Sequence, residues 1–465
     1  MIIGITGNSG TGKTSFCKAI VENIKNKTMS LLDADKIAKE LSVPGENYFK
    51  EIVILFGKEI LTDEGTINRK KLADIIFADS LKRGNLDKIT YKYVVEETKK
   101  RISKIKTDII IDAPLLIESG LNEICDIVIS TICDRKTKIE RICVRDNIDE
   151  GTAMKRLNSQ KDDGYYIQNS NYVIVNNGET NIENQANDII KFLETNCYNK
   201  EIVIIQEGDL KILQFKRFLK HKEISHAFTL KPLDFGSNNT YQNIKQKVEN
   251  NYKWLCNLLQ IDFKNIIRPY QTHTKNVVNL KDENGIFPKE LSDIDGLITN
   301  KKDKILSLVF ADCTPIFLYD KNKNIIGNIH SGWQGTLKKI AKEAIFKMKE
   351  EFKSNPEDII CAIGPTIRKC HFEVEEDVKN KFIEEFKEIC KEEEFVSKGK
   401  LVDDEQKYNI DTVYLNKKML LDSGILEENI IDSNICTVCN SCLMHSYRIE
   451  KENAGRSTAI ICKKE

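Results

Sequence analysis

Glycines at fixed spacing, followed by a lysine and a threonine, stand near the start of the chain. Residues 7–14 fit the phosphate-binding loop pattern Gly-x4-Gly-Lys-Thr. Such glycines let backbone N–H groups turn inward on a phosphate, Lys13 would reach the β- and γ-phosphates, and the Thr14 hydroxyl would ligate Mg²⁺. The pattern predicts a nucleoside triphosphate site. The predicted nucleotide-binding residues of this loop are Gly7, Asn8, Ser9, Gly10, Thr11, Gly12, Lys13 and Thr14.

Acidic residues follow two further apolar stretches in the same region. Asp33 and Asp35 come after a short apolar run, and Asp112 ends another. Ligands of parallel α/β sheets bind beyond the carboxyl ends of the strands, so these carboxylates are candidates for a catalytic base and for the Mg²⁺ shell. Taken alone, any one of them would be an ordinary helix N-cap or turn residue.

Four arginines lie in a later helical stretch of alternating charge, which is either a solvated helix face or a mobile lid that neutralises a transferring phosphate. They are Arg135, Arg141, Arg145 and Arg156. We predict that Arg141 is the catalytic member. A last strand then turns at Asn176-Asn-Gly178, and we expect Asn176 to lie near the base of the nucleotide.

The elements that must position these residues alternate between strand and helix, which predicts a doubly wound α/β fold with a parallel sheet. All six histidines lie beyond residue 200, where a new apolar strand starts at Ile202. We therefore predict two domains, residues 1–197 and 198–465, the second a separate mixed α/β (α+β) domain.

Three apolar strands of the second domain each end in a residue that binds transition metals. These residues are His273, Cys313 and His330. Two histidines and one cysteine could together form a three-ligand catalytic Zn²⁺ site with an open fourth position, where bound Zn²⁺ would lower the pKa of its water towards about 7. Each residue alone would more often be a satisfied buried histidine or a small packed cysteine.

A second cysteine motif lies further along, with Cys436, Cys439 and Cys442 at two-residue intervals and His445 after them. An iron–sulfur cluster motif requires a fourth cysteine after a three-residue spacing, and Ser446 occupies that position. A four-ligand Cys₃His zinc site within this motif is geometrically possible. We interpret the motif as structural and without metal.

Residues 1 to about 195 resemble the dephospho-CoA kinase family, which implies a P-loop kinase fold with a lid, ATP and Mg²⁺. The motifs that carry the resemblance are the phosphate loop, Asp33-Ala-Asp35-Lys-Ile-Ala, Ile67-Asn-Arg69, Asp112-Ala-Pro-Leu-Leu-Ile-Glu118, Arg156-Leu-x2-Gln160 and Tyr172-Val-Ile-Val-Asn176. The resemblance implies transfer of the ATP γ-phosphate to the ribose 3′-hydroxyl of dephospho-CoA. It makes Asp33 or Asp35 the base and gives Arg69 a role in holding substrate phosphate. One departure concerns the acceptor side, where the usual His-Pro is replaced by Thr90-Tyr91-Lys92.

Residues from about 201 onward resemble the YfiH family, also called laccase-domain or peptidoglycan-editing-factor proteins. The motifs are Gln-Thr-His273, Ala-Asp-Cys313-Thr-Pro, His330-Ser-Gly-Trp-Gln-Gly, Gly364-Pro-x-Ile-x2-Cys370 and Ser446-Tyr-Arg448 with Gly455-Arg456. The resemblance implies Zn²⁺ on the three ligands, phosphorolysis of adenosine, inosine and methylthioadenosine, and deamination of adenosine. Candidates for binding the phosphate substrate are Arg368, Arg448 and Arg456. Gln334 replaces the usual arginine after Gly-Trp, which affects the expected substrate range.

Copper-dependent polyphenol oxidation, implied by older naming of this family, carries less weight. One His/Cys/His site resembles neither a laccase's several coppers nor a blue-copper site with an axial methionine. Two further hypotheses for the second domain are cell-wall precursor editing and a non-catalytic metal-binding module that regulates the kinase. The rival hypothesis for the first domain is a kinase that acts on a different small molecule.

Composition limits the partners. Lys plus Arg and Asp plus Glu both number 71, so the zero net charge gives no reason to expect nucleic acid or a membrane surface as partner. Fourteen cysteines without a short disulfide framework, together with a start that lacks the basic segment of a signal peptide, favour the reducing cytoplasm. The oligomeric state is left open.

Overall fold

The structure is a computed structural model of the 465-residue chain. It describes residues 1–23, 29–178, 182–195, 198–236, 241–280, 291–402 and 404–464. These residues form two compact units. The first comprises Met1–Glu194 and Ile205–Asp209, and the second Thr195–Ile204 and Leu210–Glu465. The boundary predicted after residue 197 lies three residues beyond the end of the first long segment, and strand β6 (Ile202–Glu207) contributes to both units.

The first unit contains a parallel sheet with the strand order β2-β3-β1-β4-β5. Its strands are β1 (Ile2–Gly7), β2 (Met29–Asp33), β3 (Asp108–Asp112), β4 (Ile127–Ile132) and β5 (Tyr172–Val175). Strand β3 has three central isoleucines between two aspartates, and both β3 and β4 are buried over nearly their whole length, as expected for a parallel sheet covered on both faces. Residues Ile5 and Asp33 are both paired with Asp112, so β1, β2 and β3 end together at one edge of the sheet.

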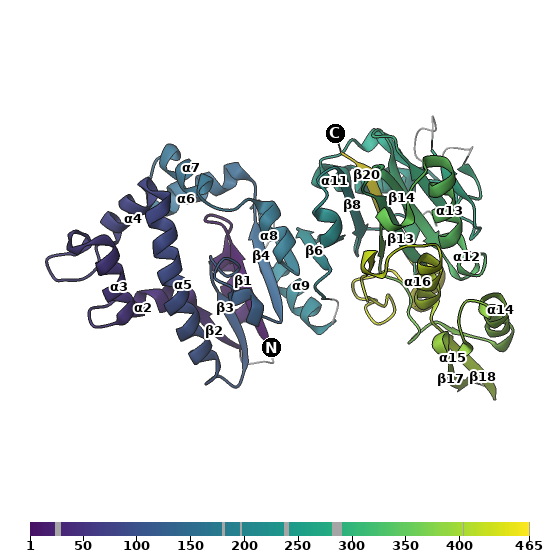
Figure 1. The fold of residues 1–465 in the computed structure, drawn as a ribbon, viewed down its shortest axis with the longest axis horizontal. Coiled ribbons are helices and arrows are strands. Elements are labelled where there is room, and N and C mark those ends of the chain that lie inside the picture. Colours follow the sequence, from purple (N-terminus) through teal and green to yellow (C-terminus); the bar gives the residue numbers. More distant parts are fainter. Residues whose placement is uncertain are drawn as a thin grey trace. The chain divides into compact units, whose positions relative to one another are not determined.

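Helices connect these strands. They are α1 (Lys13–Asn23), α2 (Ala34–Leu41), α3 (Asn47–Phe56), α4 (Arg69–Ala78), α5 (Ser80–Ile102), α6 (Arg135–Asp146), α7 (Glu150–Asn158), α8 (Asp163–Asn169) and α9 (Ile182–Glu194). Figure 1 shows helices α2 to α5 gathered on one side of the strands, and α2, α3 and α4 all contact the long helix α5. Aspartate side chains cap several helices, among them Asp33 on α2 and Asp134 on α6.

The second unit is built on mixed sheets. One contains β7 (Leu210–Phe215), β8 (Ile224–Thr229), β20 (Ser457–Lys463), β12 (Ile305–Phe310) and β9 (Ile266–Ile267), in that order. Another has the order β10 (Val277–Asn279), β11 (Gly296–Thr299), β14 (Ile325–Ser331), β13 (Thr314–Asp320), β15 (Ile359–Ile363) and β19 (Ile430–Asp432). The buried Asn328 side chain donates hydrogen bonds from β14 to the carbonyls of Leu306 and Ala459, and so ties the two sheets together.

Helices cover one face of the β10–β19 sheet. In Figure 1, α12 (Trp333–Leu337) and α13 (Ile340–Phe352) lie beside β14, and α16 (Thr412–Asp422) contacts both of these helices. A small third sheet follows the order β16 (Glu373–Val374), β18 (Glu405–Ile410) and β17 (Val396–Val402). The remaining helices are α10 (Lys216–Leu219), α11 (Tyr241–Leu259), α14 (Glu376–Phe386), α15 (Glu392–Phe395) and α17 (Tyr447–Glu450). The predicted fold class, a doubly wound kinase sheet followed by a mixed α/β unit, is confirmed.

None of the helices in the described part of the chain combines the length and apolar character needed to cross a membrane.

Candidate active sites

The phosphate loop connects β1 to α1 at the carboxyl edge of the parallel sheet. Gly10 and Gly12 have φ values of 82° and 85°, in the left-handed region that favours glycine. A Cβ atom on Gly12 would collide with Nδ2 of Asn176 unless that side chain moved, and the positive φ adds strain for any other residue, so glycine is favoured there. The Asn176 side chain in turn donates to the Thr11 carbonyl at 2.9 Å. The loop therefore packs against the residue that follows β5.

Lysine and aspartate meet at the end of the neighbouring strands. The Nζ atom of Lys13 donates to Oδ1 of Asp112 in an ion pair that is largely buried. Thr14 lies beside it in the first turn of α1 and is exposed, so its hydroxyl is accessible to an ion. The sequence makes Asp112 a candidate for the Mg²⁺ shell, and in the structure its carboxylate forms an ion pair with the lysine of the phosphate loop.

The two acids after β2 have different surroundings. Oδ1 of Asp33 accepts a hydrogen bond from the backbone N–H of Lys36 at 2.9 Å and caps α2. Asp35 lies in the first turn of that helix and remains accessible. Protein atoms around its carboxyl group nevertheless displace enough water to raise its pKa. Lys13 opposes this rise in pKa, and the negative charge of Asp33 adds to it.

Arg141 on α6 reaches the phosphate loop. Its Nη1 atom donates to the carbonyl of Gly10 at 3.2 Å and to that of Asn176 at 3.0 Å. Residues just after α7 also hold the loop, because Gln160 exchanges hydrogen bonds with Ser9 and the Lys161 carbonyl accepts from Asn8. The segment predicted as a lid thus contacts the loop through Arg141 and through Gln160, a motif residue whose role was not predicted.

The remaining arginines of this segment have partners nearby. Arg145 and Arg156 both pair with Asp146, and Arg135 donates to Asn158 at 2.7 Å. Arg69, the predicted substrate ligand, is exposed at the start of α4, where it donates to the Ser42 hydroxyl at 3.2 Å. Of the basic residues predicted for this site, Lys13 and Arg141 therefore contact the phosphate loop or its aspartate directly.

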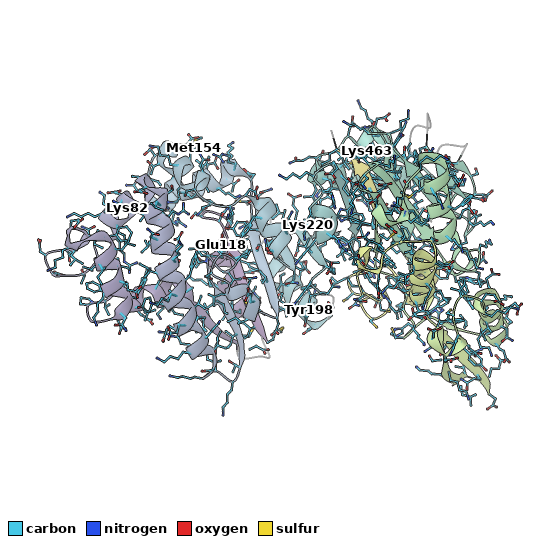
Figure 2. The ribbon with its side chains drawn as sticks, viewed as in Figure 1. Lys82, Glu118, Met154, Tyr198, Lys220 and Lys463 are labelled. Carbon is cyan, nitrogen blue, oxygen red and sulfur yellow. The ribbon has the colours of Figure 1, made fainter. Side chains whose placement is uncertain are left out.

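The residues that replace His-Pro lie on α5. Thr90 donates to the carbonyl of Leu86 and lies 2.9 Å from the hydroxyl of Tyr48. Tyr91 lies near Glu118, whose pKa is raised by burial, and Figure 2 shows Glu118 between α5 and the strands. A tyrosine and a protonatable acid therefore occupy the region where the family has histidine.

His273, Cys313 and His330 come together in the second unit. Their ligand atoms lie within 4.8 Å of one another, and Sγ of Cys313 is 3.7 Å from Nε2 of His273. The register explains this meeting, because Pro315 on β13 is paired with His330 at the end of β14. Cys313 immediately precedes β13, and His273 precedes β10 in the same sheet.

A buried carboxylate orients one of these histidines. Oδ1 of Asp295 lies 2.7 Å from Nδ1 of His330, and Asp295 is fully buried. Asp295 also accepts hydrogen bonds from the backbone N–H groups of His273 and Thr274. Burial alone would raise the pKa of Asp295, but the hydrogen bond and charge of His330, together with hydrogen bonds from Thr274, outweigh it and lower the pKa to about 2. A carboxylate on Nδ1 leaves Nε2 of His330 as the metal-binding nitrogen, which is the usual arrangement behind a histidine ligand.

The backbone at this site is unusual. His273 and Asp312 have φ values of 62° and 80°, which non-glycine residues seldom adopt and which cluster at functional sites. Asp312 is held by Thr437, which donates to Oδ1 at 2.6 Å, and by the backbone N–H of Arg448, which donates to Oδ2 at 2.6 Å. Burial raises the pKa of Cys313, but the two neighbouring histidines together lower it by more, so the thiolate that metals bind is favoured.

The three ligands line a cavity of about 740 Å³. Arg448 and Arg456 line the same cavity, with Tyr447 and Phe372. The third predicted phosphate ligand, Arg368, is absent from the lining residues. It forms a double ion pair with Asp432, so its assignment remains a prediction for which the structure supplies another partner.

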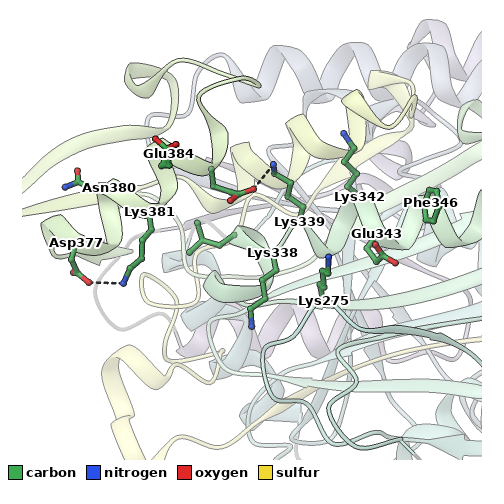
Figure 3. A pocket seen from close by; sticks show the side chains of 12 residues that line it. Lys275, Lys338, Lys339, Lys342, Glu343, Phe346, Asp377, Asn380, Lys381 and Glu384 are labelled. Carbon is green, nitrogen blue, oxygen red and sulfur yellow. Dashed lines mark hydrogen bonds and ion pairs between the residues drawn. The ribbon is translucent and has the colours of Figure 1, made fainter.

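A larger groove of about 1090 Å³ lies elsewhere on this unit and is lined by lysines and acids (Figure 3). Lys339 pairs with Glu385 at 2.7 Å and Lys381 with Asp377 at 3.1 Å. No histidine or cysteine is among the described residues that line it. Lys338 links it to the metal ligands by donating to the carbonyl of His273.

The phosphate loop, the three candidate metal ligands and the two arginines that line their cavity could all be named from the sequence. Asp295 was missed, although an aspartate directly before an apolar strand in a metal-binding domain is a usable signal. A further group, Cys370, His371, Cys436 and Cys439, also escaped prediction as a set. Cys442 and His445, which the motif spacing suggests as ligands, lie outside it.

Each of the two units matches a known protein family. The model of the dephospho-CoA kinase family matches residues 1–181, and the model described as multi-copper polyphenol oxidoreductase laccase matches residues 222–464. A dephospho-CoA kinase of Fusobacterium nucleatum is 38% identical over 197 residues, covering 42% of this chain and 98% of that protein. The purine nucleoside phosphorylase YlmD of Bacillus subtilis is 30% identical over 258 residues, covering 53% of this chain and 90% of that protein.

Two solved structures also match parts of the chain. The Bacillus licheniformis protein YfiH has 27% identity and a TM-score of 0.49, covering 56% of this chain and 99% of its own. A Campylobacter jejuni dephospho-CoA kinase has 22% identity and a TM-score of 0.31, with 41% and 96% coverage. The chain belongs to the dephospho-CoA kinase family in its first unit and to the YfiH, or laccase-like, family in its second.

Proposed function

We propose that the first unit transfers the γ-phosphate of ATP to the ribose 3′-hydroxyl of dephospho-CoA. The observation that carries this proposal is the carboxyl edge of the sheet, where Lys13, Asp112 and the Asp33/Asp35 pair surround the end of the phosphate loop. A bound Mg²⁺, held through Thr14, would neutralise charge on the phosphates. Lys13 would then exchange its contact with Asp112 for the β- and γ-phosphates.

Asp35 is the better base of the two acids. Asp33 uses one carboxylate oxygen to cap α2, whereas the raised pKa of Asp35 makes it a stronger proton acceptor. Asp35 takes the proton of the 3′-hydroxyl while that oxygen attacks the γ-phosphorus. The bond between the γ-phosphorus and its bridging oxygen breaks, and ADP leaves. Arg141 and Gln160 keep the loop in place during transfer.

An acceptor panel tests this assignment. Purified full-length protein is incubated with ATP, Mg²⁺ and either dephospho-CoA, pantetheine 4′-phosphate, adenosine or shikimate, and ADP release is followed. We expect the highest kcat/KM with dephospho-CoA, and its loss in Lys13→Met. A higher kcat/KM for another acceptor would contradict the proposal. The Thr90-Tyr91 departure is expected to change the KM for the acceptor rather than for ATP.

For the second unit we propose zinc-dependent chemistry on purine nucleosides: phosphorolysis of adenosine, inosine and methylthioadenosine, with adenosine deamination as a second reaction. The donor set fits zinc, because two imidazoles and one thiolate leave a fourth position open toward a cavity, and the buried Asp295 supports one imidazole. His273, Cys313 and His330 would hold the ion, which would supply a Lewis acid and a bound water of lowered pKa.

Other side chains that line the cavity could bind the phosphate and the purine base. Arg448 and Arg456 supply positive charge for a phosphate ion, and Phe372 and Tyr447 offer aromatic surface to a purine. In phosphorolysis, a phosphate oxygen bonds to the ribose C1′ atom while the bond from C1′ to the base nitrogen breaks. The base leaves with a proton, and ribose 1-phosphate is formed.

Product analysis tests the proposal. Wild type, Cys313→Ala and the control Cys442→Ser are assayed for zinc and then incubated with adenosine and phosphate. Adenine would show phosphorolysis, inosine would show deamination, and either should be lost in Cys313→Ala alone. Zinc-loaded wild type without either product would contradict the activity and favour precursor editing or regulation. Polyphenol oxidation with bound copper would favour the oxidase hypothesis.

A further inference from the structure

Three thiols and one imidazole from two distant segments meet near the surface of the second unit. Cys370 and His371 follow β15, whereas Cys436 and Cys439 follow β19. Sγ of Cys370 lies 3.6 Å from Sγ of Cys436 and 3.8 Å from Sγ of Cys439. Nδ1 of His371 lies 3.2, 3.6 and 3.5 Å from the sulfurs of Cys370, Cys436 and Cys439.

These separations match those between ligands on one tetrahedral zinc ion. With Zn–S bonds of about 2.3 Å and Zn–N bonds of about 2.0 Å, the tetrahedral angle places two sulfurs about 3.8 Å apart and a sulfur and a nitrogen about 3.5 Å apart. A disulfide would bring its sulfurs to about 2.05 Å. The four atoms are thus at ligand spacing, and the sulfurs are well beyond bonding distance.

The backbone explains how the two segments meet. Thr366 forms a bridge with Cys436, with the Thr366 N–H donating to the Ile435 carbonyl at 3.2 Å. The chain then turns at Arg368, whose carbonyl accepts from the N–H groups of His371 and Phe372, and this turn presents Cys370 and His371 side by side. On the other segment, the N–H of Asn440 bonds to the carbonyl of Cys436, in a turn that returns Cys439 to the same place.

We propose that Cys370, His371, Cys436 and Cys439 bind a structural zinc ion, separate from the His273, Cys313 and His330 site. Three thiolates and an imidazole are soft and borderline ligands that suit zinc, and four protein ligands leave no position open for substrate. The site differs from the one that the motif spacing suggests, since two of its ligands come from a segment more than sixty residues earlier.

Such an ion would hold part of the wall of the cavity that His273, Cys313 and His330 line. Ile367, Phe372 and Glu373, which flank the Cys370–His371 pair, line that cavity. Nη1 of Arg448 donates to the carbonyl of His371 at 3.1 Å, and Thr437, next to Cys436, donates to Asp312, which precedes the candidate metal ligand Cys313. Loss of the ion is therefore expected to loosen both Arg448 and the Asp312–Cys313 turn.

Metal counting tests the proposal on the full-length protein. We expect about two zinc ions per wild-type chain, one in Cys370→Ser, one in Cys439→Ser and one in Cys313→Ala. The matched control is Cys442→Ser, because Cys442 is exposed in the same motif but outside the cluster, and it should keep two. Unchanged zinc in both Cys370→Ser and Cys439→Ser would overturn the proposal. This count does not depend on whether the cavity acts on nucleosides.

A second measurement needs no variant and covers the case in which these substitutions prevent folding. Cys370, Cys439 and Cys442 are all exposed, so their thiols should react with iodoacetamide at similar rates unless metal protects two of them. In zinc-loaded wild type, we expect alkylation of Cys370 and Cys439 to be at least tenfold slower than that of Cys442, with the difference removed by a chelator. Equal rates before chelation, or a disulfide between cluster cysteines, would overturn the site.

Discussion

Nδ1 of His330 lies 2.7 Å from Oδ1 of Asp295, and both side chains are buried. The same carboxylate accepts hydrogen bonds from the N–H groups of His273 and Thr274. One aspartate therefore orients one candidate metal-binding imidazole and holds the loop that carries the other, although it belongs to neither motif.

Removing the charge of Asp295 should weaken metal binding. In Asp295→Asn, the amide group cannot accept all of the present hydrogen bonds, and His330 loses its charged partner. We expect a loss of about 10- to 100-fold in zinc affinity, measured by competition with a chromogenic chelator. Asp293→Asn is the matched control, because Asp293 is exposed two residues away and its carboxylate bonds to the Thr272 hydroxyl. Equal affinities of the two variants would contradict the role given to Asp295.

Substitution of the two aspartates after β2 by asparagine should reduce kinase activity to different extents. Asp35→Asn removes the proposed base, so we expect kcat of the kinase to fall by about 10²- to 10⁴-fold. Asp33→Asn keeps an efficient N-cap and should lose less activity. Steady-state kinetics with dephospho-CoA measure both, with the zinc content of the second unit as a check on folding. A larger loss in Asp33→Asn would move the base to Asp33.

Gly12 should tolerate no side chain. An alanine Cβ would clash with Nδ2 of Asn176, on a residue whose φ is 85°, and we expect loss of ATP binding by calorimetry. Gly45→Ala separates the two causes, since Gly45 has a φ of 106° but nothing within 4 Å of an added Cβ. Normal ATP binding in Gly12→Ala would show that the phosphate loop can move away from Asn176.

Substitution of Arg456 should weaken phosphate binding, whereas substitution of Arg368 should lower the stability of the fold. Arg456→Ala is expected to raise the KM for phosphate at least tenfold, because this arginine lines the metal-site cavity. Arg368→Ala should instead lower the free energy of unfolding by about 2 kcal/mol, since it removes charged hydrogen bonds to the buried Asp432. Phosphate kinetics and urea unfolding of both variants check this division. A phosphate effect confined to Arg368→Ala would reverse it.

His226 should make the second unit sensitive to acid. Burial lowers its pKa to about 3, and Nε2 accepts a hydrogen bond from the backbone N–H of Phe215 at 2.7 Å. A histidine whose folded pKa lies below its unfolded value of about 6.5 contributes stability above pH 6.5, and this contribution is lost as the pH falls toward 3. Between pH 6.5 and 4.5 the loss would be about 2 to 3 kcal/mol.

Urea unfolding at pH 7 and pH 4.5 measures this contribution. His226→Gln cannot titrate, so its loss of stability over this interval should be smaller than that of wild type. His221→Gln serves as control, because His221 lies outside the core and should leave the wild-type pH dependence in place. Identical pH dependence of wild type and His226→Gln would contradict the prediction.

Features that lie close together in the sequence were predictable. The phosphate loop is one continuous segment between a strand and a helix, so its glycines, Lys13 and Thr14 can be recognised without the fold. The alternation of strands and helices likewise indicated the doubly wound sheet. His273, Cys313 and His330 were candidate metal ligands because each ends or precedes an apolar strand, although the short distances among them do not follow from the spacing.

Tertiary structure decided which side chains meet. The pairing of β11 with β14 brings Asp295 next to His330. A β-bridge between Thr366 and Cys436 brings the Cys370–His371 pair close to Cys436 and Cys439. The spacing of the last cysteines suggests Cys442 and His445 instead, yet His445 lies 2.9 Å from the Leu233 carbonyl, outside the cluster. Local sequence determines backbone conformation over a few residues, whereas contacts between segments depend on how whole sheets pair and pack. For this protein, the sequence by itself determined the chemistry available, and the fold determined which residues share a site.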